Sequence, residues 1–165
     1  MGNVIMIGRI GVAAVFLLTM GVSTSPVLGQ RAIAPGDRTP ETVAREHIAN
    51  TLLLQCTEMG EPLELTIGQC TKAARATDLT NFERAVALRH RGIMNHRLGE
   101  FDLAIRDYTL SIDLTPEEGR SYYLKGLVYE EMGEEKRANS QYRNANLYSP
   151  DDPDVMAKMA ERGLN

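Results

Sequence analysis

The amino-acid sequence predicts an all-α fold: tandem helix-turn-helix repeats that form a short solenoid with a capping helix at the C-terminus. Three observations predict it. The 165 residues are 43% hydrophobic but only 5% aromatic, with no Trp, which favours a core of the aliphatic residues that helices tolerate well. Several identities recur at a single sequence offset, from i to i+34, and one helix-starting motif occurs three times.

The constant offset from i to i+34 defines the repeated unit. A fixed period in this range indicates a repeat architecture. The recurring pairs are Gly92 and Gly126, Gly99 and Gly133, Ala104 and Ala138, Tyr108 and Tyr142, and Pro116 and Pro150. This pattern resembles the tetratricopeptide family, and the resemblance implies a right-handed solenoid with helix-turn-helix units over 85–118 and 119–152. With the residues that precede the first unit included, we place the two repeat domains at 81–118 and 119–152.

Each recurring residue has a predicted role, which its counterpart in the next repeat should share. Gly92 should face Ala104 on the second helix, so that the two backbones approach closely. Gly99 should end the first helix with a positive φ. Tyr108 should pack inside the pair, with its hydroxyl reaching the edge.

The N-terminal segment 1–29 resembles a secretory signal peptide. Arg9 precedes an apolar run over 10–22, and a polar segment ending at Pro26 follows it. We predict cleavage after Gly29 and a periplasmic or secreted location. The alternative is an uncleaved anchor, but the run is shorter than the roughly 17 to 25 residues that span a bilayer. Residues 30–39 should form a flexible lead-in.

A divergent helical pair is predicted over 40–80, with helices at 40–58 and 62–75. Its alignment with the repeats places Cys56 and Cys70 on facing helices, and export favours a disulfide between them. Such a bond would contribute roughly 3 kcal/mol. The alternative is two buried free thiols. A metal or redox site is disfavoured, because the cysteines are not spaced Cys-x-x-Cys and no His cluster accompanies them.

A short motif predicts where helices begin. A hydroxyl residue, Pro and an acid together favour a helix start. Glu118 would complete a capping box with Thr115. The motif occurs at 39–41, 115–117 and 149–151, which predicts helix starts near Pro40, Glu117 and Asp151, with Pro153 capped by Asp152 as the alternative for the last. A C-terminal capping helix is predicted within 153–165.

The sequence contains no recognisable catalytic or cofactor site. His47, His90 and His96 are not spaced as helical metal ligands, and we find neither a nucleophile motif nor a phosphate-binding loop. The net charge of -4 disfavours nucleic acid as a partner. We therefore expect no enzyme activity, no cofactor, no metal, and no membrane association after signal cleavage.

The resemblance implies a function for the surface instead. In the family, the first helices of successive pairs line a concave face that holds a peptide. The matching peptide-binding positions are Arg89, His90, Ile93, Arg97, Arg120, Tyr123, Leu127 and Glu130. The chaperone-binding members place an Asn where this chain has Ile93 and Leu127, so that carboxylate clamp is absent.

These features predict a non-catalytic protein–protein interaction module, an adaptor or scaffold in the cell envelope. Its partner would be a protein or peptide held on the concave face. The alternative is a structural protein that stacks its repeats into a homo-oligomer.

Overall fold

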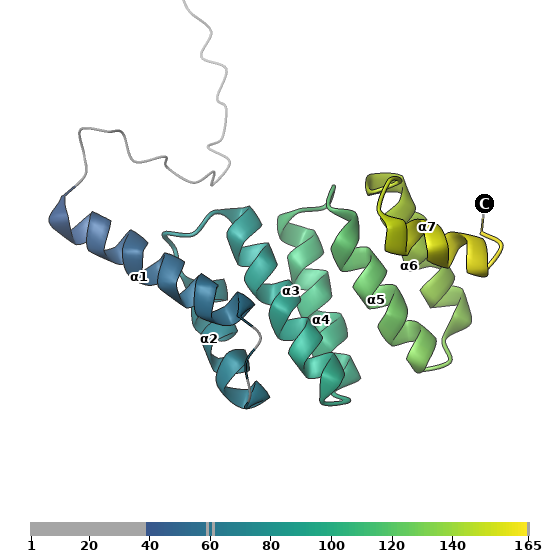
Figure 1. Ribbon diagram of the computed structural model, residues 1–165, viewed down its shortest axis with the longest axis horizontal. Helices are drawn as coiled ribbons and strands as arrows, with labels where there is room; N and C mark the ends of the chain where they lie inside the picture. The colour runs from purple at the N-terminus through teal and green to yellow at the C-terminus, as the bar shows by residue number, and fades with distance from the viewer. Residues whose placement is uncertain (1–38, 59, 61, 165) are drawn as a thin grey trace, which may run out of the picture. The chain divides into compact units, whose positions relative to one another are not determined.

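The computed structural model describes residues 39–58, 60 and 62–164, which form seven α-helices and no strand (Figure 1). The helices are α1 (Pro40–Thr57), α2 (Leu63–Arg75), α3 (Asn81–Arg97), α4 (Phe101–Leu114), α5 (Gly119–Glu131), α6 (Glu135–Tyr148) and α7 (Pro153–Glu161). The predicted signal peptide, and the predicted lead-in apart from Thr39, lie outside the described residues. Within the described part, no helix combines the length and the apolar character that crossing a bilayer requires.

The helices pack as successive hairpins, α1 with α2, α3 with α4 and α5 with α6, and α7 packs on α6 (Figure 1). Contacts between neighbouring hairpins join α2 to α3 and α4 to α5, and the first helices α1, α3 and α5 also meet in order. The predicted all-α architecture is thereby confirmed. We call α3 with α4 the first full repeat and α5 with α6 the second.

The two outermost predicted helix starts agree with the structure. α1 begins at Pro40, where the Thr39 hydroxyl accepts a hydrogen bond from the Thr42 N–H at 3.2 Å. α7 begins at Pro153, the alternative start, and the Asp152 carboxylate accepts from the N–H groups of the first turn at 2.9 and 3.3 Å. Both helices therefore start where Pro follows a side-chain cap.

The primary starts predicted near Glu117 and Asp151, from the motif copies at 115–117 and 149–151, were wrong, and so was the Thr115 capping box. α5 begins at Gly119 with Glu118 as its cap, two residues after the predicted start. Thr115 instead ends α4, and its hydroxyl donates to the Ser111 carbonyl at 3.1 Å. Ser149 likewise ends α6 and accepts from the Gly119 N–H at 3.2 Å. Both residues thus lie at the end of the preceding helix, and among the described residues neither hydroxyl accepts a hydrogen bond from the helix that the motif predicts.

The recurring glycines make room for the tyrosines of the second helices. A Cβ at Gly92 would lie 2.7 Å from Cε1 of Tyr108, and one at Gly126 would lie 2.5 Å from Cε1 of Tyr142. The nearest neighbours are thus tyrosine rings, where the sequence suggested Ala104 and Ala138. Both rings are fully buried, so each glycine is the socket for one ring.

The prediction for the helix-ending glycines is confirmed, whereas the prediction for the Tyr108 hydroxyl is wrong. Gly99 and Gly133 have φ values of 76° and 72°, as predicted for residues that end a first helix. The Tyr142 hydroxyl donates to Glu130. The Tyr108 hydroxyl, expected at the edge, is buried and has no hydrogen-bond partner among the described residues.

A disulfide joins the first two helices. The structure bonds Cys56 to Cys70, and both are fully buried beside Ala49, Ala73 and Ala87. The bond therefore lies in the core where α1, α2 and α3 meet, as the sequence alignment with the repeats suggested.

Candidate functional site: the first-helix face and a groove between second helices

The predicted peptide-binding residues lie on α3 and α5, the first helices of the two full repeats. Their side chains fall into three groups. Three are charged and make ion pairs with neighbouring helices, three are apolar and pack on the core, and the third group holds the half-buried His90 and the exposed Arg97.

The charged residues of α5 contact α7. The Arg120 guanidinium lies 2.7 Å from an Asp154 carboxylate oxygen and 3.6 Å from one of Asp152, and it stacks 5.1 Å from the centroid of the Tyr123 ring. Burial lowers the pKa of Arg120, but the Asp154 hydrogen bond and both carboxylates outweigh it and raise that pKa overall. Arg120 therefore stays charged and ties α5 to the start of α7.

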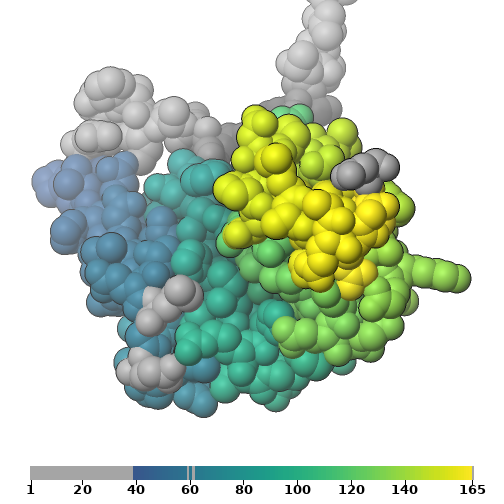
Figure 2. Space-filling view, turned by 45° about the vertical axis from the view of Figure 1, so that its right-hand side comes forward, coloured from purple at the N-terminus to yellow at the C-terminus, as the bar shows by residue number. Residues whose placement is uncertain are grey.

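Glu130 makes the second connection to α7. It accepts the hydrogen bond from the Tyr142 hydroxyl, and its carboxylate lies 3.0 Å from Arg162 and 3.5 Å from Lys158. Figure 2 shows the yellow atoms of α7 and the residues after it lying over the green helices. In this chain, predicted peptide-binding residues of the second repeat thus hold the capping helix.

Two residues of α3 contact carboxylates at the two ends of α5. Arg89 lies 2.7 Å from Glu118 at the start of α5, with 14% of its side chain exposed, and His96 lies 3.1 Å from Glu131 at the end. Burial, and then the neighbouring Arg89 charge, lowers the pKa of His90. Its Nδ1 has no hydrogen-bond partner among the described residues.

The apolar members join the two repeats. Ile93, Tyr123 and Leu127 are half-buried and pack against one core cluster, formed by Ala104, Tyr108, Leu124 and Val128. Arg97 is exposed in the last turn of α3. The first-helix face is therefore largely a network of contacts between successive helices, with Arg97 as the predicted binding residue that solvent reaches most readily.

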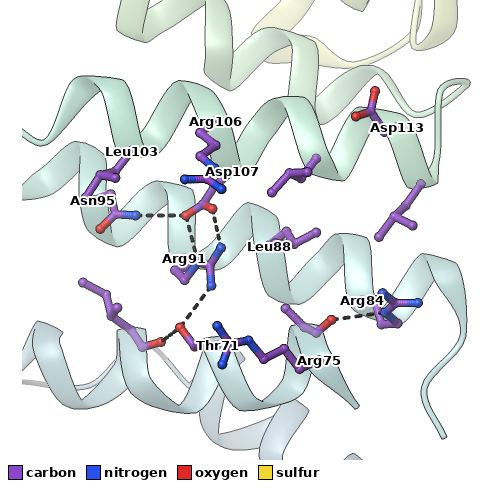
Figure 3. A pocket seen from close by; sticks show the side chains of 14 residues that line it. Thr71, Arg75, Arg84, Leu88, Arg91, Asn95, Leu103, Arg106, Asp107 and Asp113 are labelled. Carbon is purple, nitrogen blue, oxygen red and sulfur yellow. Dashed lines mark hydrogen bonds and ion pairs between the residues drawn. The ribbon is translucent and has the colours of Figure 1, made fainter. Parts of the chain in front are cut away.

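A hollow that the sequence analysis did not identify lies between α2, α3 and α4 (Figure 3). Its volume is about 540 Å³. Four arginines line it: Arg75, Arg84, Arg91 and Arg106. Its apolar lining includes Ile67, Leu88, Leu103, Leu110 and Leu114. We call this hollow the arginine groove.

A chain of hydrogen bonds crosses the arginine groove and joins all three helices (Figure 3). Arg91 of α3 donates two bonds to the Asp107 carboxylate of α4, at 2.9 and 2.5 Å, and a third to the Thr71 hydroxyl of α2, at 3.0 Å. Asn95 also donates to Asp107, at 2.9 Å. Only 4% of the Asp107 side chain is exposed, so this two-point pair is fixed in a mostly buried setting.

Two arginines and two leucines of the groove are exposed to solvent. Arg75 and Arg106 are exposed, and neither makes an ion pair or hydrogen bond with any residue in the described ranges. Leu103 and Leu110 are also exposed, although both are large and apolar. The sequence does carry a signal: the groove residues of α4 recur three and four positions apart, as a second stripe beside the one that faces the core.

The comparisons with solved structures identify the fold. The crystal structure of MamA matches with a TM-score of 0.56 and 22% identity, over 78% of this chain and 81% of that one. The first TPR of Spaghetti (RPAP3), bound to the HSP90 peptide SRMEEVD, matches with a TM-score of 0.52 and 16% identity, over 75% of this chain and 91% of that one. This chain has a tetratricopeptide fold. No family model matches the sequence, and no curated protein does.

The tetratricopeptide hairpins present no metal site in the described ranges, because no group of three or more His, Cys, Asp or Glu side chains gathers there. Their polar chemistry consists mainly of ion pairs between helices and the exposed arginines of the groove. Such groups can bind and orient a partner through charge and shape.

Proposed function

We propose that the protein is a non-catalytic interaction module that binds a protein or peptide partner after export to the cell envelope. The observation that carries this proposal is the tetratricopeptide fold, shared with a domain that holds a peptide. The fold supplies paired helices with large exposed side faces. The buried disulfide agrees with an oxidising compartment, where such bonds persist.

For the first-helix face we propose a restricted binding surface around Arg97. Its side chain is exposed, whereas those of Arg89, Arg120 and Glu130 are half-buried, so solvent and a ligand reach Arg97 more readily than these three. Ile93 and Leu127 supply apolar contact at the positions where a carboxylate clamp has Asn. The proposed ligand is therefore a segment that combines apolar side chains with a carboxylate for Arg97.

The test compares capture of envelope proteins by the chain 30–165 and by two variants. Arg97→Glu reverses the charge on the first-helix face, and Arg143→Glu makes the same change at an exposed position of α6. Proteins captured by the wild type and by Arg143→Glu, but not by Arg97→Glu, would support the proposal. Equal capture by all three proteins would refute it for this face.

Self-association is a second candidate, because α1 exposes apolar side chains. Val43, Ile48 and Leu54 are 48%, 58% and 57% exposed, so they could pack against a second copy of the chain. Light scattering of the chain 30–165 at several concentrations tests this candidate. A concentration-independent monomer would exclude it, and a dimer that Ile48→Glu abolishes would support it.

A further inference from the structure

We propose that the arginine groove binds a short, extended, acidic segment of a partner protein. Its carboxylates would pair with Arg75 and Arg106, and its apolar side chains would rest on the leucines of α4. This surface differs from the first-helix face, and the proposal stands whether or not that face binds a ligand.

The groove has the size and rigidity of a binding site. Its volume of about 540 Å³ falls within the roughly 300 to 1,000 Å³ that ligand pockets occupy. The Thr71–Arg91–Asp107 connection fixes its three helices relative to one another. Arg84 adds a hydrogen bond from its Nε to the Ala74 carbonyl, at 3.1 Å. A ligand therefore meets a preformed site and does not have to order it.

The charge of the groove selects a carboxylate. Four arginines but only two acids, Asp107 and Asp113, line it, although the whole chain has a net charge of -4. Asp107 is already paired with Arg91. The exposed guanidiniums of Arg75, on α2, and Arg106, on α4, remain available on two walls of the groove. Guanidinium groups bind carboxylates in a planar, two-point geometry, so an acidic ligand satisfies both arginines.

The spacing of the apolar lining selects an extended peptide. Leu103 and Leu110 are 47% and 38% exposed and lie on the same stripe of α4, with Arg106 between them. At 1.5 Å per residue they are about 10 Å apart along the helix, the span of about three residues of an extended chain. The lined part of α4 continues to Leu114, about 16 Å in all, which suits about five extended residues.

The corresponding place in the second repeat carries larger side chains. Tyr122 and Tyr148 are the equivalents, one repeat later, of Leu88 and Leu114 in the groove lining, and their rings stack with centroids 5.5 Å apart. The repeat thus tolerates large side chains that fill this space. The first repeat has smaller leucines instead, and the space between its helices stays open.

The test uses the disulfide-bonded chain 30–165 and fluorescein-labelled five-residue peptides. The panel covers all sequences in which Leu or Ile alternates with Asp or Glu, and each peptide has a counterpart with Asn or Gln for the acids. Fluorescence anisotropy should show acidic peptides binding about tenfold or more tightly than their amide counterparts. The proposal is overturned if no acidic peptide binds more tightly than its counterpart.

Variants locate the binding. The double variant Arg75→Ala with Arg106→Ala should lower the affinity for the best-binding peptide by about tenfold or more. The control is Lys136→Ala with Arg143→Ala, which removes the same charge from exposed positions of α6 and should leave the affinity unchanged. Circular dichroism should give all these variants the wild-type helix content, since the altered side chains are exposed. Equal binding by the Arg75 and Arg106 variant would overturn the proposal.

A substitution that fills the groove gives an independent check. Leu88→Tyr with Leu114→Tyr copies the stacked tyrosines of the second repeat and should abolish peptide binding while the arginines stay in place. A competition arm adds octanoate, a small apolar carboxylate. If octanoate displaces the peptide at equal or lower concentration, the occupant is a small organic acid and the peptide proposal fails.

Discussion

The space beside the second helix differs between the two full repeats, although both hairpins follow one pattern. Between α2, α3 and α4, leucines and a buried Arg91–Asp107 pair line an open groove. Between α4, α5 and α6, Tyr122 stacks on Tyr148, and Lys125 donates to the Thr109 hydroxyl at 2.8 Å. The two repeats thus share a hairpin core, while the space beside it varies.

This difference shows which positions keep the same residue in both repeats and which vary between them. Gly92 and Gly126 both seat a tyrosine ring, and a larger residue at either would clash with it. Positions 88 and 114, in contrast, hold Leu, and the equivalent positions of the second repeat hold Tyr. Substitutions at positions where the two repeats carry different residues should therefore test how the repeats differ.

The largest effect is expected at Asp107. Asp107→Ala leaves the Arg91 guanidinium without its carboxylate in a mostly buried place, which costs roughly 3 to 5 kcal/mol. Gln141→Ala, at the equivalent position of the second repeat, should change the free energy of unfolding by less than about 0.5 kcal/mol. Urea denaturation followed by circular dichroism measures both. Similar losses for the two variants would mean that the repeats do not differ as described.

A double variant separates the buried charge from the loss of packing. Arg91→Met with Asp107→Leu removes both charges and keeps apolar volume, so it should recover most of the stability lost in Asp107→Ala. If the double variant is as unstable as the single one, the unpaired charge is not the cause.

The disulfide should have the next largest effect, confined to the N-terminal side. Cys56→Ala with Cys70→Ala opens a loop with a sequence separation of 14 and should lower the free energy of unfolding by about 3 kcal/mol. Urea denaturation measures this, and reductant added to the wild type should reproduce the loss. Hydrogen exchange should show faster opening of α1 and α2 with little change in α5 and α6. Uniformly faster exchange would show that the bond stabilises the whole array.

A smaller effect is expected from making the second repeat resemble the first. Tyr122→Leu with Tyr148→Leu removes a stacked ring pair worth about 1 kcal/mol beyond its buried area. Thermal and urea unfolding measure the loss. As a control, Tyr129→Leu keeps the stacked pair and shortens another half-buried tyrosine that packs, like Tyr122, on the core of the second repeat. A loss for Tyr129→Leu that equals the loss for the double variant would argue against the stacked pair as a distinct contribution.

The smallest effect concerns pH and His90, whose equivalent in the second repeat is the buried Leu124. Burial and Arg89 lower the pKa of His90 in the folded protein below its usual 6.5. As pH falls below about 6.5, the unfolded chain gains this proton before the folded chain does, so stability decreases. His90→Leu should reduce the fall in stability between pH 7.5 and 5.5. An unchanged pH slope in that variant would contradict the assignment, and His47→Leu, at an exposed position, serves as the control.

Much of the hairpin architecture was predictable because its determinants are local or periodic. The glycines that end the first helices and the tyrosines inside each pair recur at one spacing, and a backbone turn or a ring socket needs only those residues. Aligning a third unit with the same pattern placed Cys56 and Cys70 on facing helices, and the export prediction favoured a disulfide over two free thiols. Thr115 was misjudged because its hydroxyl binds the carbonyl four residues earlier, a second local choice open to such side chains. Ser149 was misjudged because the N–H it accepts from belongs to Gly119, far away in the sequence.

The sequence by itself determined the repeated helical hairpins, since a helix and its turn depend on residues three or four positions apart. Only the tertiary structure decided what the surfaces present. It paired Arg120 with Asp154, which is far away in the sequence. Arg120, predicted to bind a peptide, therefore contacts α7 instead. The tertiary structure also brought Arg75 and Arg106 together from different hairpins to line the same groove. Such contacts depend on how the helices stack, which no local pattern encodes.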